Sequence, residues 1–378
     1  MADSRAIVGV DIGTSGVRGV QLKGRPGSYS VHRAAAVPLP RDAIRNGNVA
    51  DAPAVTTALR RLWRSGGFST HRAAFGLADS GVLTRQLDLP WMPPEDFRSA
   101  LRYQVTDALP VDVRSVELDY HLLAEFEGTD DRGRATPMNR ILVVAADRAA
   151  VVHEATVVRK GRFEPVVADS TALALIRAAC HGVLPDDSAL HALVDVGAHH
   201  LTVVLHQGGQ PRFVRTVASL GGETATEAVA ERLDLDLDEA EALKRVTGLN
   251  GPPRLVASVA ESSVFAVGQS GDGMPPDPRT ALVMETLGSW ASGITAEVRN
   301  SLDYFAASTP GTAVTDLTLN GRTFLLSGLE DRFATQFRLP VRRLGHLAGL
   351  PASDRVMRAG LESESLGVAI GLAMSVTP

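Results

Sequence analysis

The amino-acid sequence predicts an α/β fold made of two similar halves, and two observations carry that prediction. A hairpin of strand, Asp, glycine turn and strand occurs twice, at residues 7–22 and at residues 193–205. Segments with helical and strand periodicity alternate along the rest of the chain, which is typical of α/β domains. The chain has 378 residues, enough for two or three domains that each bury a hydrophobic core. We therefore expect a duplicated fold with one hairpin opening each half.

The two hairpins share a motif suited to phosphate. The first copy reads Val10-Asp11-Ile12-Gly13-Thr14-Ser15-Gly16, and the second reads Val194-Asp195-Val196-Gly197-Ala198-His199-His200. Glycine lets backbone N–H groups approach phosphate oxygens closely. The carboxylates of Asp11 and Asp195 suit a hydrated magnesium ion, which is held through one or two carboxylates and keeps several waters. The duplication predicts two half-sites facing one polyphosphate, and two unrelated Asp-Gly turns are the alternative.

Composition narrows the class of protein. Hydrophobic residues make up 44% of the chain and the mean hydropathy is +0.04, values typical of a soluble protein. No apolar run approaches the roughly 18 residues that span a bilayer, and the N-terminus lacks a signal-peptide pattern, so we expect a cytoplasmic protein. A net charge of -5 argues against nucleic-acid binding. The single Cys180 is expected to be a small buried hydrophobe, with no disulfide framework or zinc pattern around it.

Periodicity places the elements of the first half. A strand at 29–37 precedes an amphipathic helix that Asp51 can cap, and residues 72–89 return to a strand pattern. A helix then opens at Pro93-Pro94-Glu95-Asp96 and is followed by two strands, at 115–126 and 140–146. This strand, helix, strand, strand order predicts an inserted subdomain at about residues 85–162.

The first half is expected to end at residue 188, and the second half to cover residues 189–378. A helix at about 149–160, a strand at 165–168 and a helix from Asp169 complete the first half, with a linker at 184–190. The second half is expected to contain helices from Gly221-Gly222-Glu223, from Leu237 and at about 281–307, a Gly- and Pro-rich loop at 268–279, a strand at 317–319, and a small-residue helix at 365–374 that packs on a sheet.

Three sequence runs carry a resemblance to a known family: Val8-Gly9-Val10-Asp11-Ile12-Gly13-Thr14-Ser15, the stretch from Leu89-Pro90-Trp91-Met92-Pro93 to Val116-Glu117-Leu118-Asp119-Tyr120, and Ser219-Leu220-Gly221-Gly222-Glu223. With them the chain resembles the actin-like (ribonuclease H-like) ATPase superfamily and, within it, the PilM family of type IV pilus assembly. The middle run is the most specific, because it corresponds to that family's inserted subdomain, an SHS2 domain that actin, sugar kinases and Hsp70-type chaperones do not share. The resemblance covers essentially the whole chain.

The resemblance implies a site for ATP and Mg²⁺, with the metal held by Asp11 and Asp195 through water. Arg18 stands where relatives usually carry lysine. Glu241 and Lys244 stand where relatives contact the ribose and adenine, and a solvated i,i+3 ion pair is the alternative. The implied nucleotide-binding positions are Asp11, Gly13, Thr14, Ser15, Gly16, Arg18, Asp195, Gly197, Ala198, His199, Gly221, Gly222, Glu241, Lys244, Gly321 and Arg322.

The adenine loop departs from the family pattern. Relatives carry a glycine triplet and a small residue there, whereas this chain reads Asn320-Gly321-Arg322-Thr323-Phe324. If Arg322 or Thr323 had to adopt a glycine-only conformation, each would cost about 1–2 kcal/mol, and both side chains would enter the space of the purine. ATP binding would then be weakened about ten- to a hundredfold, or absent. His199 and His200 likewise replace the Ser or Thr of many relatives, and a histidine on a surface turn is the plainer interpretation.

Three functions stay open at this point. The first, which we favour, is a nucleotide-responsive scaffold of the inner-membrane pilus assembly platform with weak or absent ATPase activity. The second is an ATPase or phosphotransferase of the sugar-kinase type, for which Asp169 is the candidate general base, although Asp169 also reads as an ordinary helix N-cap. The third is a pseudo-ATPase scaffold that binds no nucleotide.

The resemblance also implies a partner. In the PilM family the insertion and the first half's sheet form a groove for the N-terminal cytoplasmic tail of a PilN-like, single-pass inner-membrane protein, which would attach this chain peripherally to the membrane. We expect Leu89, Trp91 and Met92 to line that groove, and packing into the insertion's own core is the alternative. Pilus assembly ATPases and a second copy of the chain are further candidate partners.

Overall fold

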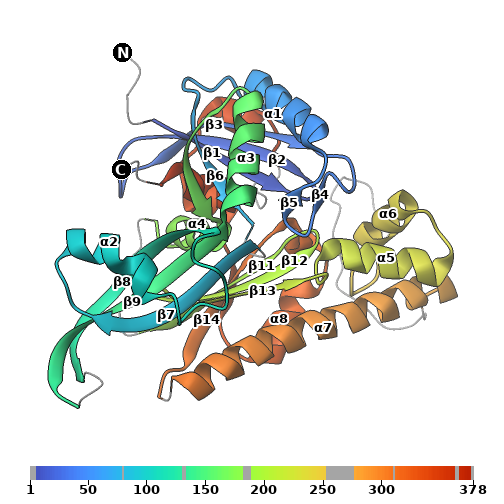
Figure 1. Cartoon of the computed structure of the whole chain (residues 1–378). Coiled ribbons are helices and arrows are strands. Elements are labelled where there is room, and N and C mark those ends of the chain that lie inside the picture. Colours follow the sequence, from blue (N-terminus) through green and yellow to red (C-terminus); the bar gives the residue numbers. More distant parts are fainter. Residues whose placement is uncertain are drawn as a thin grey trace.

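Two five-stranded sheets of the same topology form the body of the protein (Figure 1). The computed structural model describes residues 6–78, 81–129, 133–181, 189–252, 276–309, 311–361 and 366–375. The first sheet has the order β10-β6-β1-β2-β3, with β1 (Val8–Gly13), β2 (Gly16–Lys23), β3 (Ser30–Pro38), β6 (Arg72–Leu77) and β10 (Glu164–Ser170). The second has the order β13-β12-β11-β14-β15, with β11 (Leu190–Val196), β12 (His200–Gln207), β13 (Gln210–Ala218), β14 (Val314–Asn320) and β15 (Val341–Arg343).

The directions of the strands repeat as well as their order. In the first sheet β1, β2 and β3 pair antiparallel, and β6 and β10 add in parallel on the other side of β1. In the second sheet β11, β12 and β13 pair antiparallel, and β14 and β15 add in parallel on the other side of β11. The duplicated hairpins expected from the sequence are therefore equivalent pairs of strands in two equivalent sheets.

Helices lie between the sheets and on their outer faces. Apolar side chains of α4 (Thr171–Ala179) and α10 (Gly367–Ala373) share one core with Val20 of β2 and Val204 of β12. A Cβ at Gly371 would lie 1.8 Å from the carbonyl oxygen of Ala174, so glycine lets the two central helices touch.

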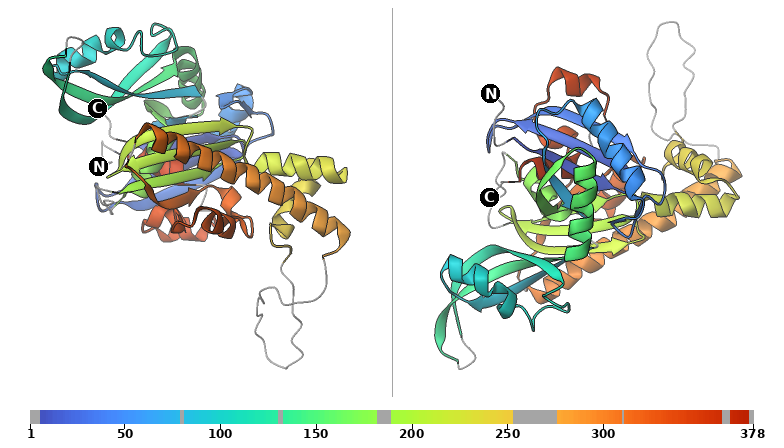
Figure 2. Two further views of the ribbon diagram at one scale, coloured as in Figure 1. Left: turned by 90° about the horizontal axis from the view of Figure 1, so that it is seen from below. Right: turned by 45° about the horizontal axis from the view of Figure 1, so that its top comes forward.

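The outer faces of the sheets are covered by longer helices. The helices α1 (Ala52–Gly66) and α3 (Arg148–Lys160) pack on the first sheet. Along the second sheet runs α7 (Pro278–Ser308) (Figure 2). Asp51 caps α1 by accepting a hydrogen bond from the backbone N–H of Ala54, as predicted. The remaining helical segments are α5 (Gly222–Leu233), α6 (Leu237–Thr247), η2 (Arg322–Leu325), α8 (Leu329–Phe337), η3 (His346–Gly349) and α9 (Asp354–Arg358).

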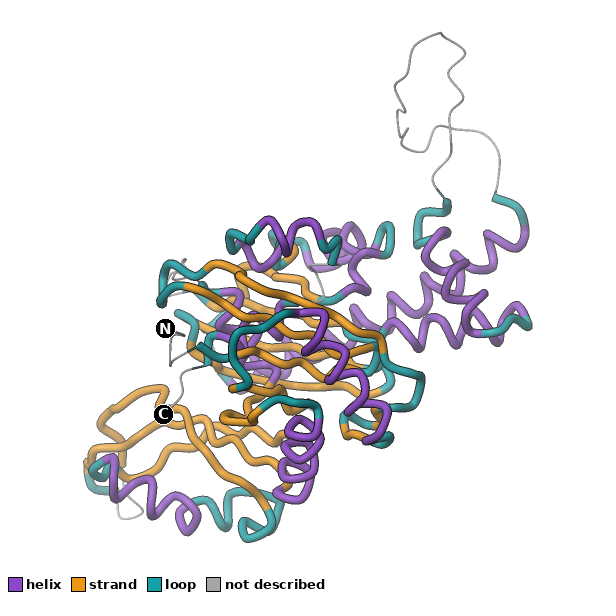
Figure 3. Tube along the Cα trace, turned by 90° about the horizontal axis from the view of Figure 1, so that it is seen from above, coloured by secondary structure: helices purple, strands orange, loops and turns teal. Residues whose placement is uncertain are grey.

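The inserted segment forms a small sheet of its own, set apart from the two main sheets (Figure 3). Its order is β7-β9-β8, with β7 (Val82–Pro90), β8 (Val116–Thr129) and β9 (Ala135–Asp147), all antiparallel. On one face packs α2 (Pro94–Gln104), which buries Phe97 and Leu101. The hairpin of β4 (Ile44–Arg45) and β5 (Asn48–Val49) lies between β3 and α1 in sequence.

The structure corrects several details of the sequence interpretation. Residues 72–89 form two strands, because β6 completes the first sheet and β7 then enters the insertion. The N-cap of α4 is Ser170, whose hydroxyl accepts from the N–H of Leu173, and not Asp169. Of the predicted loop at 268–279, residues 268–275 lie outside the described residues, and the helix α7 already begins at Pro278. Most of the linker at 184–190 also lies outside them.

Composition predicted a buried Cys180 and no membrane-spanning segment. Cys180 is half-buried at the end of α4, where burial raises the pKa of its thiol to about 11 against a smaller opposing effect of Arg342. None of the described helices combines the length and the apolar character needed to cross a membrane.

Candidate functional site

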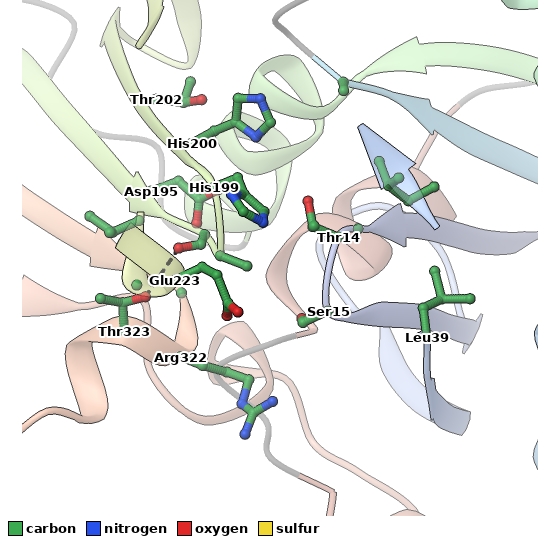
Figure 4. Close-up of a pocket in the computed structure, with 18 of the residues that line it drawn as sticks. Thr14, Ser15, Leu39, Asp195, His199, His200, Thr202, Glu223, Arg322 and Thr323 are labelled. Atoms are coloured by element: carbon green, nitrogen blue, oxygen red, sulfur yellow. Dashed lines mark hydrogen bonds between the residues drawn. The ribbon is translucent and has the colours of Figure 1, made fainter. Parts of the chain in front are cut away.

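A cleft of about 660 Å³ opens where the two hairpin turns face each other (Figure 4). Ligand sites of small molecules typically have volumes of about 300–1,000 Å³. Thr14 and Ser15 of the first turn lie opposite His199 and Glu223. All the predicted nucleotide-binding positions line this cleft except Gly16 and Gly221. The sheets therefore bring together residues that lie far apart in the sequence.

Gly16 and Gly221 lie beside the cleft and shape its walls. Gly16 pairs with Pro38 where β2 begins. A Cβ at Gly221 would lie 2.2 Å from the carbonyl oxygen of Ala198. Its own carbonyl accepts a hydrogen bond from the indole Nε1 of Trp290, at 3.0 Å. These glycines permit close backbone packing and do not themselves line the open space.

Arg18 organises the first turn. Its guanidinium donates to the hydroxyl of Ser15 at 2.8 Å and to the carbonyl of Gly16 at 3.1 Å, and lies 3.4 Å from a carboxylate oxygen of Asp11. Asp11 is only 9% exposed. Burial raises the pKa of its carboxyl, and the positive charge of Arg18 acts in the opposite direction. The guanidinium of Arg18 is thus held beside the first turn by Ser15, Gly16 and Asp11, at the edge of the cleft.

The second turn is held by neighbouring segments. The amide of Asn320 donates to the carboxylate of Asp195 at 2.6 Å. The N–H of Gly222 donates to the carbonyl of Gly197 at 2.9 Å, and the hydroxyl of Thr323 donates to the same carbonyl at 3.2 Å. Burial, helped by the nearby His199, lowers the pKa of His200. The turn, the start of α5 and η2 therefore form one connected unit.

A buried ion pair between Glu241 and Lys244 lines the cleft. The ammonium of Lys244, a residue only 8% exposed, contacts Glu241 at 2.5 Å and donates to the carbonyl of Gly222 and the hydroxyl of Thr226. Burial alone would raise the pKa of Glu241, but hydrogen bonds from Lys244 and Thr226 outweigh it and lower that pKa to about 2. The alternative of a solvated surface pair is wrong, because the ammonium is enclosed by protein.

The adenine loop contains one glycine-only position. Gly321 has φ of +104°, and a Cβ there would lie 2.4 Å from the carbonyl oxygen of Val196. Arg322 and Thr323 lie in the turn of 3-10 helix η2 and have no positive φ. The strain considered for these two residues is therefore absent. The side chain of Arg322 nevertheless lines the cleft (Figure 4).

The model of the family described as type IV pilus assembly protein PilM matches residues 9–253. This chain belongs to the PilM family. The resemblance inferred from the sequence is confirmed by this match.

Solved structures show the fold. A structure titled PilM-PilN type IV pilus biogenesis complex is similar with a TM-score of 0.78 and 21% identity, covering 97% of each chain. Ethanolamine utilization protein EutJ from Carboxydothermus hydrogenoformans is similar with a TM-score of 0.53 and 16% identity, over 98% of this chain and 90% of that one. MreB 5 of Spiroplasma citri bound to AMPPNP is similar with a TM-score of 0.50 and 12% identity, over 90% of this chain and 92% of that one. The fold of this PilM family member is actin-like, as the sequence predicted.

Asp169, the predicted general base, does not line the cleft. Its carboxylate accepts hydrogen bonds from the guanidinium of Arg177 and, at 2.8 Å, from the hydroxyl of Ser375. Arg177 belongs to α4 and Ser375 follows α10, so the carboxylate of Asp169 is held between these two segments. This placement does not favour proton transfer to a ligand in the cleft.

The predicted partner-binding residues of this PilM family member differ in exposure. Leu89 is only 9% exposed and packs into the core of the insertion. Met92 is partly buried against the same core. Trp91 is 46% exposed, and its indole Nε1 donates to Glu125 on β8 at 3.3 Å. Of the three, Trp91 offers the most surface to a partner.

Sequence reasoning missed two residues that line the cleft from opposite sides, Arg41 and Glu223. They form an ion pair across it. No local signal distinguishes Arg41 from the many other arginines of the chain. The acidic residue after Gly221-Gly222 could have been noted, because a carboxylate in the first turn of α5 faces Ser15 of the first hairpin turn across the cleft (Figure 4).

Proposed function

We propose that this PilM family protein is a nucleotide-binding scaffold of the type IV pilus assembly platform. One observation carries the proposal: two equivalent hairpin turns place Asp11 and Asp195 in the same cleft, each with a glycine two residues later. Two similar half-sites around one space suit a polyphosphate. MreB 5 of Spiroplasma citri, which has a similar fold, was solved bound to AMPPNP, and this supports nucleotide binding by this fold.

The residues of the cleft fit ATP with Mg²⁺. The backbone of both turns and the guanidinium of Arg18 would hold the phosphates, and the segment around Lys244 and Arg322 would hold the ribose and adenine. Among the described residues no three His, Cys, Asp or Glu side chains converge on a metal position. Magnesium would therefore depend on phosphate oxygens and water beyond Asp11 and Asp195. Bound ATP would supply the negative charge that draws the two turns together.

The partner we propose is the N-terminal cytoplasmic tail of a PilN-like membrane protein. The similar structure with a TM-score of 0.78 is that of a PilM-PilN complex. The exposed indole of Trp91 at the end of β7 suits an apolar side chain of an extended segment. Such a tail would hold this protein on the cytoplasmic side of the inner membrane. Binding of pilus assembly ATPases and self-association stay predictions.

A pseudo-ATPase scaffold is the second candidate, and the side chain of Arg322 favours it. The resemblance to the PilM family implies a glycine at this position, whereas the guanidinium of Arg322 lines the cleft. If the purine cannot displace or stack on Arg322, no nucleotide binds. We propose little or no ATP turnover in either case, since Asp169 is held outside the cleft.

Nucleotide binding is tested by thermal denaturation of the purified chain with ATP, with and without Mg²⁺. A ligand at about 100 times its Kd stabilises a protein by about 2.7 kcal/mol. Asp11→Asn and Asp195→Asn should each abolish the Mg²⁺-dependent shift. Asp88→Asn, which changes an exposed carboxylate of the insertion paired with Arg140, is the matched control. No shift in the wild type at millimolar ATP would reject the nucleotide site and leave the pseudo-ATPase.

Tail binding is tested by calorimetry with a synthetic partner tail. We expect a micromolar Kd and at least a tenfold weaker Kd for Trp91→Ala. Tyr103→Ala is the matched control, because Tyr103 is an aromatic residue of the same insertion and is 84% exposed. Equal binding to wild type and Trp91→Ala would show that the tail docks elsewhere.

A further inference from the structure

Arg41 joins the two halves of the protein at the mouth of the cleft. It lies in the loop between β3 and β4, beside Leu39, which also lines the cleft. Its guanidinium forms an ion pair with Glu223 in the first turn of α5, and its Nη2 lies 3.3 Å from a carboxylate oxygen of Asp238 in the first turn of α6. Arg41 and Asp238 are 197 positions apart in the sequence.

Each end of the Arg41–Glu223 pair is connected to a hairpin turn by the backbone. On the first side, the N–H of Leu39 donates to the carbonyl of Ser15 at 3.3 Å. On the second side, the N–H of Glu223 donates to the carbonyl of Ala198 at 2.8 Å. A change in the separation of the two turns therefore acts directly on the ion pair.

The Arg41–Glu223 pair lies away from the core that joins the two sheets, at the side where the cleft would open. The two sheets are joined by the core around α4 and α10. The first turns of α5 and α6, which carry Glu223 and Asp238, lie away from that core, on the side of the β4–β5 hairpin (Figure 1). Of the ion pairs formed by the described residues, those that connect the β3–β4 loop to α5 and α6 are both made by Arg41. Opening of the cleft at this side has to break them.

We propose that Arg41 is a positioning residue that holds the cleft closed and slows the release of a bound nucleotide. The part concerning nucleotide release rests on the proposed function, whereas the closure itself does not. The side chains of Arg41 and Glu223 are 42% and 22% exposed, so water and salt screen the interaction. A partly exposed pair of this kind changes an equilibrium or a rate by about fivefold.

The first experiment measures release of a fluorescent ATP analogue by stopped-flow displacement with unlabelled ATP. We expect release to be about fivefold faster from Arg41→Ala, with a smaller increase for Asp238→Asn and little change in the association rate. Arg45→Ala is the matched control, because Arg45 lies in the same segment and forms its ion pair with the neighbouring Asp42, at 3.5 Å. Added salt should speed release from the wild type more than from Arg41→Ala. Equal release rates for wild type and Arg41→Ala would overturn the proposal.

The second experiment measures closure without nucleotide. Spin labels are placed at the exposed positions Asn48 and Glu239 in a Cys180→Ala background, and their distance distribution is recorded by pulsed electron resonance. Arg41→Ala should broaden the distribution and move it to longer distances, and Arg41→Lys should restore part of the closure. An unchanged distance distribution in Arg41→Ala would show that Arg41 does not hold the cleft closed. If the wild type binds no analogue, the proposed function fails, and the label distances still decide the role of Arg41.

Discussion

Lys244 and Glu241 form a buried ion pair, with the ammonium 2.5 Å from a carboxylate oxygen. The pair links α6 to the start of α5, because the same ammonium donates to the carbonyl of Gly222 at 2.8 Å. Glu241 also accepts from Arg245 at 2.6 Å and from Thr226 at 2.6 Å. Both oxygens of its carboxylate are therefore engaged within the protein. The pair holds in place the wall of the cleft to which the resemblance to the PilM family assigns the ribose and adenine.

Removing the negative charge of Glu241 should lower the free energy of unfolding more than removing the positive charge of Lys244. Glu241→Gln leaves a buried ammonium without its counter-charge. We expect a loss of about 2 kcal/mol in the free energy of unfolding, below the roughly 3–5 kcal/mol of fully buried pairs, because the Glu241 side chain is 27% exposed. Lys244→Met should cost less than about 1 kcal/mol, since Arg245 and Thr226 still satisfy Glu241. Urea denaturation of both variants checks the order, and a larger loss for Lys244→Met would contradict it.

Gly321 should tolerate no side chain. Its φ is +104°, and a Cβ at this position would lie only 2.4 Å from the carbonyl oxygen of Val196, so Gly321→Ala is strained. We expect it to lower stability by about 2 kcal/mol or more. Gly288→Ala, in the interior of α7 where a Cβ meets open space, should instead raise stability by about 0.5–1 kcal/mol. Thermal denaturation of the two alanine variants gives opposite shifts if this account of Gly321 is correct.

Single substitutions should separate the roles of Arg322 and Thr323. Arg322→Gly removes a side chain from the cleft and should tighten adenine-nucleotide binding, although no backbone strain is relieved. Thr323→Gly should not help, because it deletes the hydroxyl that donates to the carbonyl of Gly197. Nucleotide titration of both variants measures the difference. Weaker binding by Arg322→Gly would mean that the guanidinium stacks on the base.

Glu154 should make stability depend on pH. It is 5% exposed on α3, and burial raises its pKa to about 8. Between its ordinary value of 4.5 and about 8, the folded state binds more protons than the unfolded state, so stability should fall as the pH rises through this window. Glu154→Gln should remove this dependence and exceed the wild type in melting temperature at pH 8 but not at pH 5.

The control for Glu154 is Glu164→Gln, which changes an exposed glutamate at the start of β10. It should leave the melting temperature within error at both pH values. If the melting temperature of Glu154→Gln varied with pH in parallel with that of the wild type, the raised pKa of Glu154 would not be the cause of the pH dependence.

The sequence by itself determined the duplicated hairpins, the insertion and the longer helices. Short signals suffice for this: alternating apolar residues, a glycine turn after Asp11 and Asp195, and the N-cap at Asp51. Such signals act over a few residues, where local sterics and hydrogen bonds decide the conformation. The resemblance to the PilM family came from equally local motifs.

Tertiary structure decided which side chains meet. The sequence left the Glu241–Lys244 pair between a solvated pair and a ligand contact, and only the packing of α6 against α5 shows that its ammonium is buried. The sequence predicted Asp169 to be either a general base or a helix N-cap. In the structure the segment after α10 returns to the first sheet and brings the hydroxyl of Ser375 to the Asp169 carboxylate. The sequence did not foresee Arg41, because the partners of that guanidinium lie on the other half. Such contacts depend on how the shared core around α4 and α10 sets the two sheets against each other, and no short stretch of sequence encodes that arrangement.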